Sequence, residues 1–177
     1  MLKHIPIKNR IVLVGFSGAG KSTIAKKIAS NLNFTALDTD KLLEEKYRIS
    51  VYDCFEKYGE DAFRKLEYNI LKEVLKQENV VIATGGGTPC FLDAMTLINE
   101  NAFSIYIEMS VKSLVQRLLY AKTVRPLTKH KTEEELFEFV SNQLKIREPF
   151  YQQAHLTIKG ENIDLKSMVN CASARIF

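Results

Sequence analysis

The chain has little cysteine, with only Cys54, Cys90 and Cys171 among its 177 residues. This odd number, without the spacing of metal ligands, gives no sign of a disulfide framework or a zinc site. None of the three lies in a recognisable nucleophile motif. We therefore expect three reduced thiols in a cytoplasmic protein.

Long apolar runs are also absent. No stretch approaches the roughly 20 apolar residues that a membrane span needs, so no membrane partner is expected. Residues 1–6 form no apolar signal region, so we do not expect secretion. Apolar residues make up 46% of the chain and charged residues 26%, which is typical of a globular protein. With no repeat, linker or low-complexity segment, residues 1–177 are expected to form a single domain.

Acidic side chains are missing between Met109 and Thr132, although the net charge of the whole chain is only +4. The basic residues of this segment are Lys112, Arg117, Lys122, Arg125, Lys129 and Lys131. Such a segment can bind nucleic acid, or it can bind the phosphates of a nucleotide. A solvated basic surface is the third interpretation.

The strongest positive signal is the motif G-x-x-x-x-G-K-[ST] at residues 15–22. Residues 10–14 before it are apolar and β-branched, which predicts a buried strand. Residues 23–32 after it carry apolar side chains at helical spacing. Glycines let the backbone N–H groups turn toward one anion, and the helix N-terminus adds partial positive charge. Lys21 would reach the outer phosphates and Ser22 would offer a hydroxyl to Mg²⁺; an ordinary glycine-rich turn is the alternative.

Strand and helix patterns alternate along the chain. Strands are predicted at residues 10–14, 34–37, 79–83, 103–107 and 155–159. Helices are predicted at residues 23–32, 41–47, 60–77 and 111–120, from 132 to about 149, and from 164 onward, with residues 172–177 poorly ordered. This alternation predicts an α/β fold with a central parallel sheet between helices. Ligands of such sheets bind beyond the carboxyl ends of the strands.

Two aspartates, Asp38 and Asp40, follow the second predicted strand. Alternation along an extended chain would point both toward one side. One of them would help to position Mg²⁺, through water, and the other would accept a proton from an attacking hydroxyl. The alternative is that Asp40 is the N-cap of the following helix.

Three further features gain meaning only in combination. The triplet at residues 85–87 is glycine alone, which suits close approach of a ligand or a plain loop. Arg64 and Glu67 share one helical face and would otherwise be a surface ion pair. Arg125 and Arg147 each stand near a proline and carry no signal by themselves.

Together these motifs resemble those of the shikimate kinase family over residues 11–158. The matching pieces are Gly-Phe-Ser-Gly-Ala-Gly-Lys-Ser-Thr (15–23), Leu-Asp-Thr-Asp (37–40), Phe-Arg-Lys-Leu-Glu (63–67), Gly-Gly-Gly (85–87), Arg-Pro-Leu (125–127) and Arg-Glu-Pro-Phe-Tyr (147–151). The resemblance implies a three-layer α/β/α P-loop kinase fold. It also implies ATP-dependent phosphorylation of the shikimate 3-hydroxyl in aromatic amino acid biosynthesis, by a cytoplasmic enzyme that we expect to be a monomer.

The same resemblance assigns roles to residues. Asp40 would hold shikimate hydroxyls and act as the base, while Arg64, supported by Glu67, and Arg147 would grip the shikimate carboxylate. The remaining shikimate contacts would be the backbone at Gly86 and Gly87 and the apolar side chains of Val51, Phe55 and Phe63. The ATP contacts would be Gly18, Ala19, Gly20, Lys21, Ser22, Thr23 and Arg125. Lys21 and Arg125 would touch the transferring phosphate, Ser22 would bind Mg²⁺ with help from Asp38, and Arg125 would belong to a mobile lid at about residues 112–131.

One position departs from the family pattern. Leu118 stands where the family usually has an arginine that stacks on adenine, seven residues before Arg125. Either the neighbouring Arg117 replaces it, or the stacking contact is apolar. The loop at residues 160–162 also matches the adenine side weakly.

Rival functions fit less well. Gluconate kinase would need a different acceptor pocket, and the joint presence of Arg64, the glycine triplet and Arg147 argues against it. A nucleoside monophosphate kinase would need a second phosphate site and a lid pattern that are absent. A GTPase switch would need the motifs Asn-Lys-x-Asp and Asp-x-x-Gly, and neither occurs. A nucleic-acid binder that uses the basic segment is the remaining alternative, and no nucleic-acid partner is expected.

Overall fold

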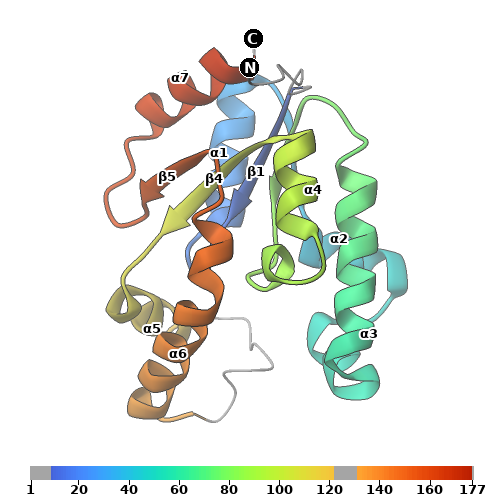
Figure 1. Ribbon diagram of the computed structural model, residues 1–177, viewed down its shortest axis with the longest axis vertical. Coiled ribbons are helices and arrows are strands. Elements are labelled where there is room, and N and C mark those ends of the chain that lie inside the picture. Colours follow the sequence, from blue (N-terminus) through green and yellow to red (C-terminus); the bar gives the residue numbers. More distant parts are fainter. Residues whose placement is uncertain (1–8, 122–130, 177) are drawn as a thin grey trace.

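The structure is a computed structural model that describes residues 9–121 and 131–176. Within these residues the chain forms a five-stranded parallel sheet with the order β2-β3-β1-β4-β5 (Figure 1). The strands are β1 (Arg10–Val14), β2 (Thr35–Asp38), β3 (Val80–Ala83), β4 (Phe103–Glu108) and β5 (Leu156–Lys159). Each predicted strand is found, with its ends within one residue of the expected ones.

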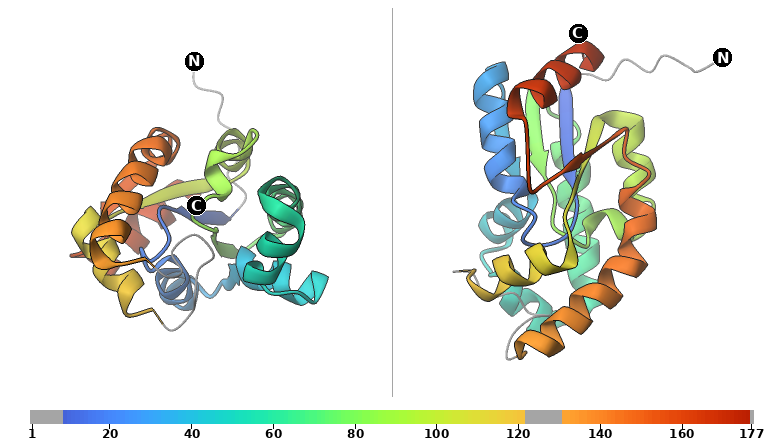
Figure 2. Two further views of the ribbon diagram at one scale, coloured as in Figure 1. Left: turned by 90° about the horizontal axis from the view of Figure 1, so that it is seen from below. Right: turned by 90° about the vertical axis from the view of Figure 1, so that its left-hand side faces the viewer.

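The helices lie on both faces of this sheet. They are α1 (Lys21–Leu32), α2 (Thr39–Tyr47), α3 (Val51–Val74), α4 (Ala94–Asn101), α5 (Val111–Leu119), α6 (Glu133–Tyr151) and α7 (Leu165–Ile176), with a short 3₁₀ helix η1 (Thr88–Cys90). Figure 2 shows α1 on one side of the sheet and α4 and α6 on the other. The predicted three-layer α/β/α architecture is therefore confirmed. Among the described residues, no helix is both long and apolar enough to cross a membrane.

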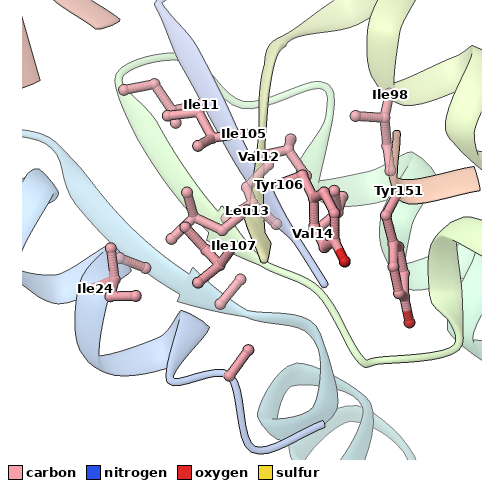
Figure 3. Close-up of a cluster of buried hydrophobic side chains, with 14 of the residues drawn as sticks. Ile11, Val12, Leu13, Val14, Ile24, Ile98, Ile105, Tyr106, Ile107 and Tyr151 are labelled. Atoms are coloured by element: carbon pink, nitrogen blue, oxygen red, sulfur yellow. The ribbon is translucent and has the colours of Figure 1, made fainter. Parts of the chain in front are cut away.

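The core is centred on β1, whose five residues are all buried. Val12 pairs with Ile82 of β3 on one side and with Ser104 of β4 on the other. The apolar side chains of β1 and β4 lie together in Figure 3, where Tyr106 of β4 also faces Tyr151 of α6. A strand buried on both faces needs apolar residues at every position, which explains why residues 11–14 read as a continuous apolar run.

Several helices differ from the prediction. α3 begins at Val51 rather than at Glu60, because Ser50 caps its first turn by accepting from the Asp53 N–H. Gly59, with φ 79° and ψ 172°, interrupts α3, so the predicted start at Glu60 marks its second segment. η1 and α4 were not predicted. The expected disorder from Ala172 onward is wrong through Ile176, because α7 continues there and Ala172 is fully buried.

The carboxyl ends of β1, β2 and β3 bring three loops together. β1 leads into the glycine loop at residues 15–20, and β2 ends at Asp38. β3 leads into the glycine triplet, where the Gly85 N–H donates to Thr39 Oγ1 at 3.1 Å. The predicted convergence at this edge of the sheet is confirmed.

Candidate active site

The glycine loop wraps around the start of α1. Gly18 and Gly20 have φ values of +87° and +89°, and Gly20 is the N-cap of α1. These left-handed conformations favour glycine, and they turn the loop so that Lys21 is the first residue of α1. The buried Lys21 ammonium donates to the carbonyls of Gly15 and Phe16 at 2.6 and 2.8 Å. The loop therefore holds a cation and a helix N-terminus at one place, which suits an anion.

Two adjoining pockets open at this edge of the sheet. The phosphate-loop pocket is lined by Ser17, Gly18, Gly20, Lys21, Ser22, Thr23, Asp38, Asp40, Thr84, Gly85 and Gly86. The arginine pocket is lined by Phe16, Ser17, Asp40, Val51, Phe55, Phe63, Arg64, Glu67, Gly85, Gly86, Gly87, Phe139 and Arg147. Every predicted site residue within the described ranges lines one of them except Ala19, which is buried in the loop.

Asp38 and Asp40 have different surroundings. Asp38 Oδ1 accepts from the Asp40 and Lys41 N–H groups at 3.1 and 3.3 Å, so Asp38 is the N-cap of α2. Its other oxygen accepts from Ser22 Oγ at 2.5 Å. The alternative that Asp40 caps the helix is therefore wrong. Asp40 instead lines both pockets.

The Ser22 and Asp38 pair suits a magnesium ion. A hydroxyl and a carboxylate are hard oxygen ligands of the kind that Mg²⁺ prefers. Among the residues that the structure describes, no group of three or more His, Cys, Asp or Glu side chains could hold a metal. Mg²⁺ commonly takes its other ligands from water and substrate phosphates, so one hydroxyl and one carboxylate beside the phosphate-loop pocket fit this pattern.

Arg64 is fixed in the arginine pocket by two carboxylates. Its guanidinium donates to Glu67 Oε2 and to Glu60 Oε1, each at 2.9 Å. Only 8% of Arg64 and 3% of Glu67 is exposed, so the alternative of a surface ion pair is wrong. Burial raises the pKa of Glu67, while Arg64 and the hydrogen bond from Thr88 oppose this shift. Thr88 Oγ1 donates to Glu67 Oε1 at 2.6 Å and so fixes the carboxylate from the other side.

Arg147 brings a second cation from α6. It is buried, and its Cζ lies 5.4 Å from the centroid of the Phe16 ring. One turn later on α6, the buried Tyr151 hydroxyl donates to the Gly86 carbonyl at 2.5 Å. Two planar guanidinium groups beside apolar rings suit a small ligand that has a carboxylate and a carbon ring.

The glycine triplet lies too close to its neighbours for side chains. A Cβ atom on Gly87 would lie 2.5 Å from the guanidinium of Arg64, and one on Gly86 would lie 2.6 Å from Ser17 Oγ. One on Gly85 would lie 2.4 Å from Glu67 Oε1 and 2.8 Å from Asp40 Oδ1. The triplet is therefore a tightly packed wall between the two pockets, which rules out a plain surface loop.

A model of the shikimate kinase family matches residues 17–173 of the chain. The chain belongs to the shikimate kinase family. A shikimate kinase from Azobacteroides pseudotrichonymphae is 45% identical over 161 residues, which cover 90% of this chain and 95% of that protein.

Solved shikimate kinases also share the fold. The enzyme from Bacteroides thetaiotaomicron is 38% identical with a TM-score of 0.86, and the alignment covers 93% of this chain and 96% of that one. The enzyme from Acinetobacter baumannii, solved in complex with shikimate, is 30% identical with a TM-score of 0.82 and coverages of 96% and 93%. The predicted family, the P-loop kinase fold and an ATP-dependent kinase with an alcohol acceptor are confirmed.

The departure from the shikimate kinase pattern lies at the end of α5. The Arg117 guanidinium donates to the carbonyls of Gly18 and Ala19 at 3.4 and 3.3 Å. Leu118 also approaches the loop, since a Cβ atom on Gly18 would lie 3.4 Å from its Cδ2. Both candidates for the adenine side therefore adjoin the phosphate loop. Residues 122–130 of the predicted lid, with Arg125 among them, lie outside the described residues.

The site also contains residues to which the sequence analysis assigned no role. Glu60 and Thr88 hold the Arg64 and Glu67 pair, Tyr151 binds the glycine triplet, and Ser17 lines both pockets. Glu60 could have been found from its spacing of four residues before Arg64 on one helix. Thr88 and Tyr151 meet their partners only through the tertiary fold.

Proposed function

We propose that this chain transfers the γ-phosphoryl group of ATP to the 3-hydroxyl of shikimate across the boundary between the two pockets. The observation that carries the proposal is that Asp40 lines both the phosphate-loop pocket and the arginine pocket. A group at this boundary can contact an acceptor hydroxyl while that hydroxyl faces the donor phosphate. Phosphoryl transfer requires this roughly in-line arrangement.

The arginine pocket would hold shikimate. Arg64 and Arg147 bind its carboxylate, and the backbone of Gly86 and Gly87 contacts its ring substituents. Val51, Phe55 and Phe63 form the apolar wall, where the Phe55 and Phe63 ring centroids lie 5.7 Å apart. Asp40 accepts the proton of the 3-hydroxyl as the hydroxyl oxygen attacks the γ-phosphorus and the bond to the β,γ-bridging oxygen breaks. The products are shikimate 3-phosphate and ADP.

The phosphate-loop pocket would hold the triphosphate. The residues that surround the phosphates are Gly18, Ala19, Gly20, Lys21, Ser22 and Thr23. Lys21 and Arg125 neutralise the negative charge on the transferring group. Ser22, assisted by Asp38, would hold Mg²⁺, which supplies positive charge to the phosphate oxygens when it is bound. Residues of about 112–131 serve as a lid that carries Arg125 and excludes water, which otherwise competes as the acceptor.

We further propose that the protein acts as a monomer in the cytoplasm, without a nucleic-acid or membrane partner. The basic segment then serves the nucleotide phosphates. Titration with duplex DNA at low and moderate salt checks this, because binding through phosphates weakens steeply as salt increases. Tight, salt-sensitive DNA binding by the intact protein would contradict it.

An assay that couples ADP release to a readout tests the reaction itself. Shikimate, gluconate and nucleoside monophosphates are offered as acceptors in parallel, each with ATP and Mg²⁺. We expect turnover with shikimate alone. Turnover of another acceptor without turnover of shikimate would overturn the proposed reaction.

A further inference from the structure

Ser17 stands at the junction of the two pockets. Four residues line both pockets, namely Ser17, Asp40, Gly85 and Gly86. Of these, only Ser17 and Asp40 carry a polar side chain. Asp40 is occupied in the proposed reaction by the proton of the acceptor hydroxyl. Among the described residues that line both pockets, Ser17 is then the other one whose side chain can bind a group at the boundary.

The Ser17 side chain packs against the glycine triplet. A Cβ atom on Gly86 would lie 2.6 Å from Ser17 Oγ and 2.8 Å from Ser17 N, so Ser17 is pressed against the backbone of the glycine triplet. The triplet is held in turn by the Tyr151 hydroxyl at the Gly86 carbonyl. Ser17 therefore contacts a backbone segment that a hydrogen bond from α6 holds in place.

The hydroxyl is also available. Within residues 9–121 and 131–176, Ser17 Oγ makes no hydrogen bond, whereas Ser22 of the same loop donates to Asp38. Phe16 on one side of Ser17 lies against Arg147, and Gly18 on the other side lines the phosphate-loop pocket. The hydroxyl therefore lies between the place for a carboxylate-bearing acceptor and the place for phosphates.

We propose that Ser17 is a further catalytic residue, whose hydroxyl donates a hydrogen bond to a non-bridging oxygen of the phosphoryl group during transfer. The inference rests on the proposed shikimate phosphorylation. Charge is spread over the three equatorial oxygens of the group in the transition state, and a fixed donor aimed at such charge lowers the barrier. Ser17 keeps its proton throughout. The bond that breaks is the one to the β,γ-bridging oxygen, and the bond that forms is the one to the acceptor oxygen.

The test compares Ser17→Ala with Ser30→Ala, a control at an exposed position on α1. For each variant, kcat and both KM values are measured. The affinity for the complex of ADP, aluminium fluoride and shikimate, in which the fluoride mimics the phosphoryl group in transfer, is measured alongside. We expect Ser17→Ala to lower kcat by about 10- to 100-fold, with KM values within about twofold. The analogue complex should weaken by a similar factor.

Each outcome decides the question. A kcat for Ser17→Ala within about twofold of the unmodified protein, or a loss confined to KM, would overturn the role of Ser17 alone. A lower kcat together with a normal affinity for the aluminium fluoride complex would also overturn this role. The loss of kcat would then come from a distorted loop and not from a missing hydrogen bond to the transferring group. If the unmodified protein and Ser30→Ala both fail to phosphorylate shikimate, the proposed function is overturned and the role of Ser17 with it.

Discussion

Asp38 and Asp40 lie two residues apart, yet their carboxylates have different surroundings. Both oxygens of Asp38 are used, one by the first turn of α2 and the other by Ser22. Asp40 Oδ1 instead faces Gly85, at the wall between the two pockets. These different surroundings support the proposed assignment of Asp38 to Mg²⁺ and of Asp40 to the acceptor hydroxyl.

Replacing Asp40 by asparagine should remove the proton acceptor and keep the shape. We expect Asp40→Asn to bind ATP with near-normal affinity and to lose about 10²- to 10⁴-fold in kcat, the usual contribution of a positioned base. Assays of ADP release give kcat, and titration with nucleotide gives the affinity for ATP. Asp61→Asn, an exposed change on α3, is the control. A near-normal kcat in Asp40→Asn would remove Asp40 from the chemistry.

Arg147 should affect one substrate far more than the other. Hydrogen bonds between charged groups contribute about 1.5–3 kcal/mol, so Arg147→Ala should raise the KM for shikimate roughly 10- to 100-fold. The KM for ATP should change little, because Arg147 lines only the arginine pocket. Arg147→Lys keeps the positive charge but lacks the planar guanidinium group, so its KM for shikimate should lie between those of the unmodified protein and Arg147→Ala. Equal increases in both KM values would refute the carboxylate role.

Arg64 and Arg147 line the same pocket, but the spacing of residues along the sequence could place only one of them. Arg64 and Glu67 could be placed on one helical face from the sequence. Nothing in the local sequence around Arg147 brings it to the same pocket, because that proximity arises only when α6 packs near the glycine triplet. This part of the prediction came from the family resemblance alone.

Among the elements, α3 shapes the apolar wall through its interruption at Gly59. Phe55 precedes the interruption and Phe63 follows it, and both line the arginine pocket. The first segment was missed although Val51, Cys54 and Phe55 have helical spacing, because it is short and ends at a glycine. α4 was missed for a related reason, since eight residues without a side-chain cap give little periodic signal.

A substitution at Gly59, which interrupts α3, should destabilise the protein. Its Cβ position is open, with nothing within 4 Å, so a substitution causes no clash there. Its φ of 79° and ψ of 172° belong to a region that side chains avoid at a cost of about 1–3 kcal/mol. Gly59→Ala should lose stability by about this amount in urea unfolding and should also raise the KM for shikimate. Lys57→Ala, an exposed change in the same helix, is the control, and a loss below about 0.5 kcal/mol would contradict the strain.

At the scale of the whole molecule, the order of the strands creates the two-pocket site. β1 lies at the centre, so the loop that follows it is flanked by the end of β3 and, one strand further, by the end of β2. That convergence follows from parallel strands alone and could be predicted. The sequence could not show which side chains would meet there, such as Ser17 against Gly86 or Thr88 against Glu67. These contacts depend on distances between loops, and no local pattern encodes them.

Because both pockets lie at one edge of the same sheet and share four of the described residues, a ligand bound in either should stabilise the fold around that sheet. A ligand at about 100 times its Kd adds roughly 2.7 kcal/mol, which for a domain of this size raises Tm by roughly 5–10 °C. We expect ADP with Mg²⁺ and shikimate each to raise Tm when added alone, as followed by thermal unfolding. Arg147→Ala should lose most of the shift caused by shikimate and keep the shift caused by ADP, while Asp61→Asn should keep both. Loss of the ADP shift in Arg147→Ala would mean that this side chain supports the fold of the phosphate loop rather than the acceptor, because Arg147 also contacts Phe16.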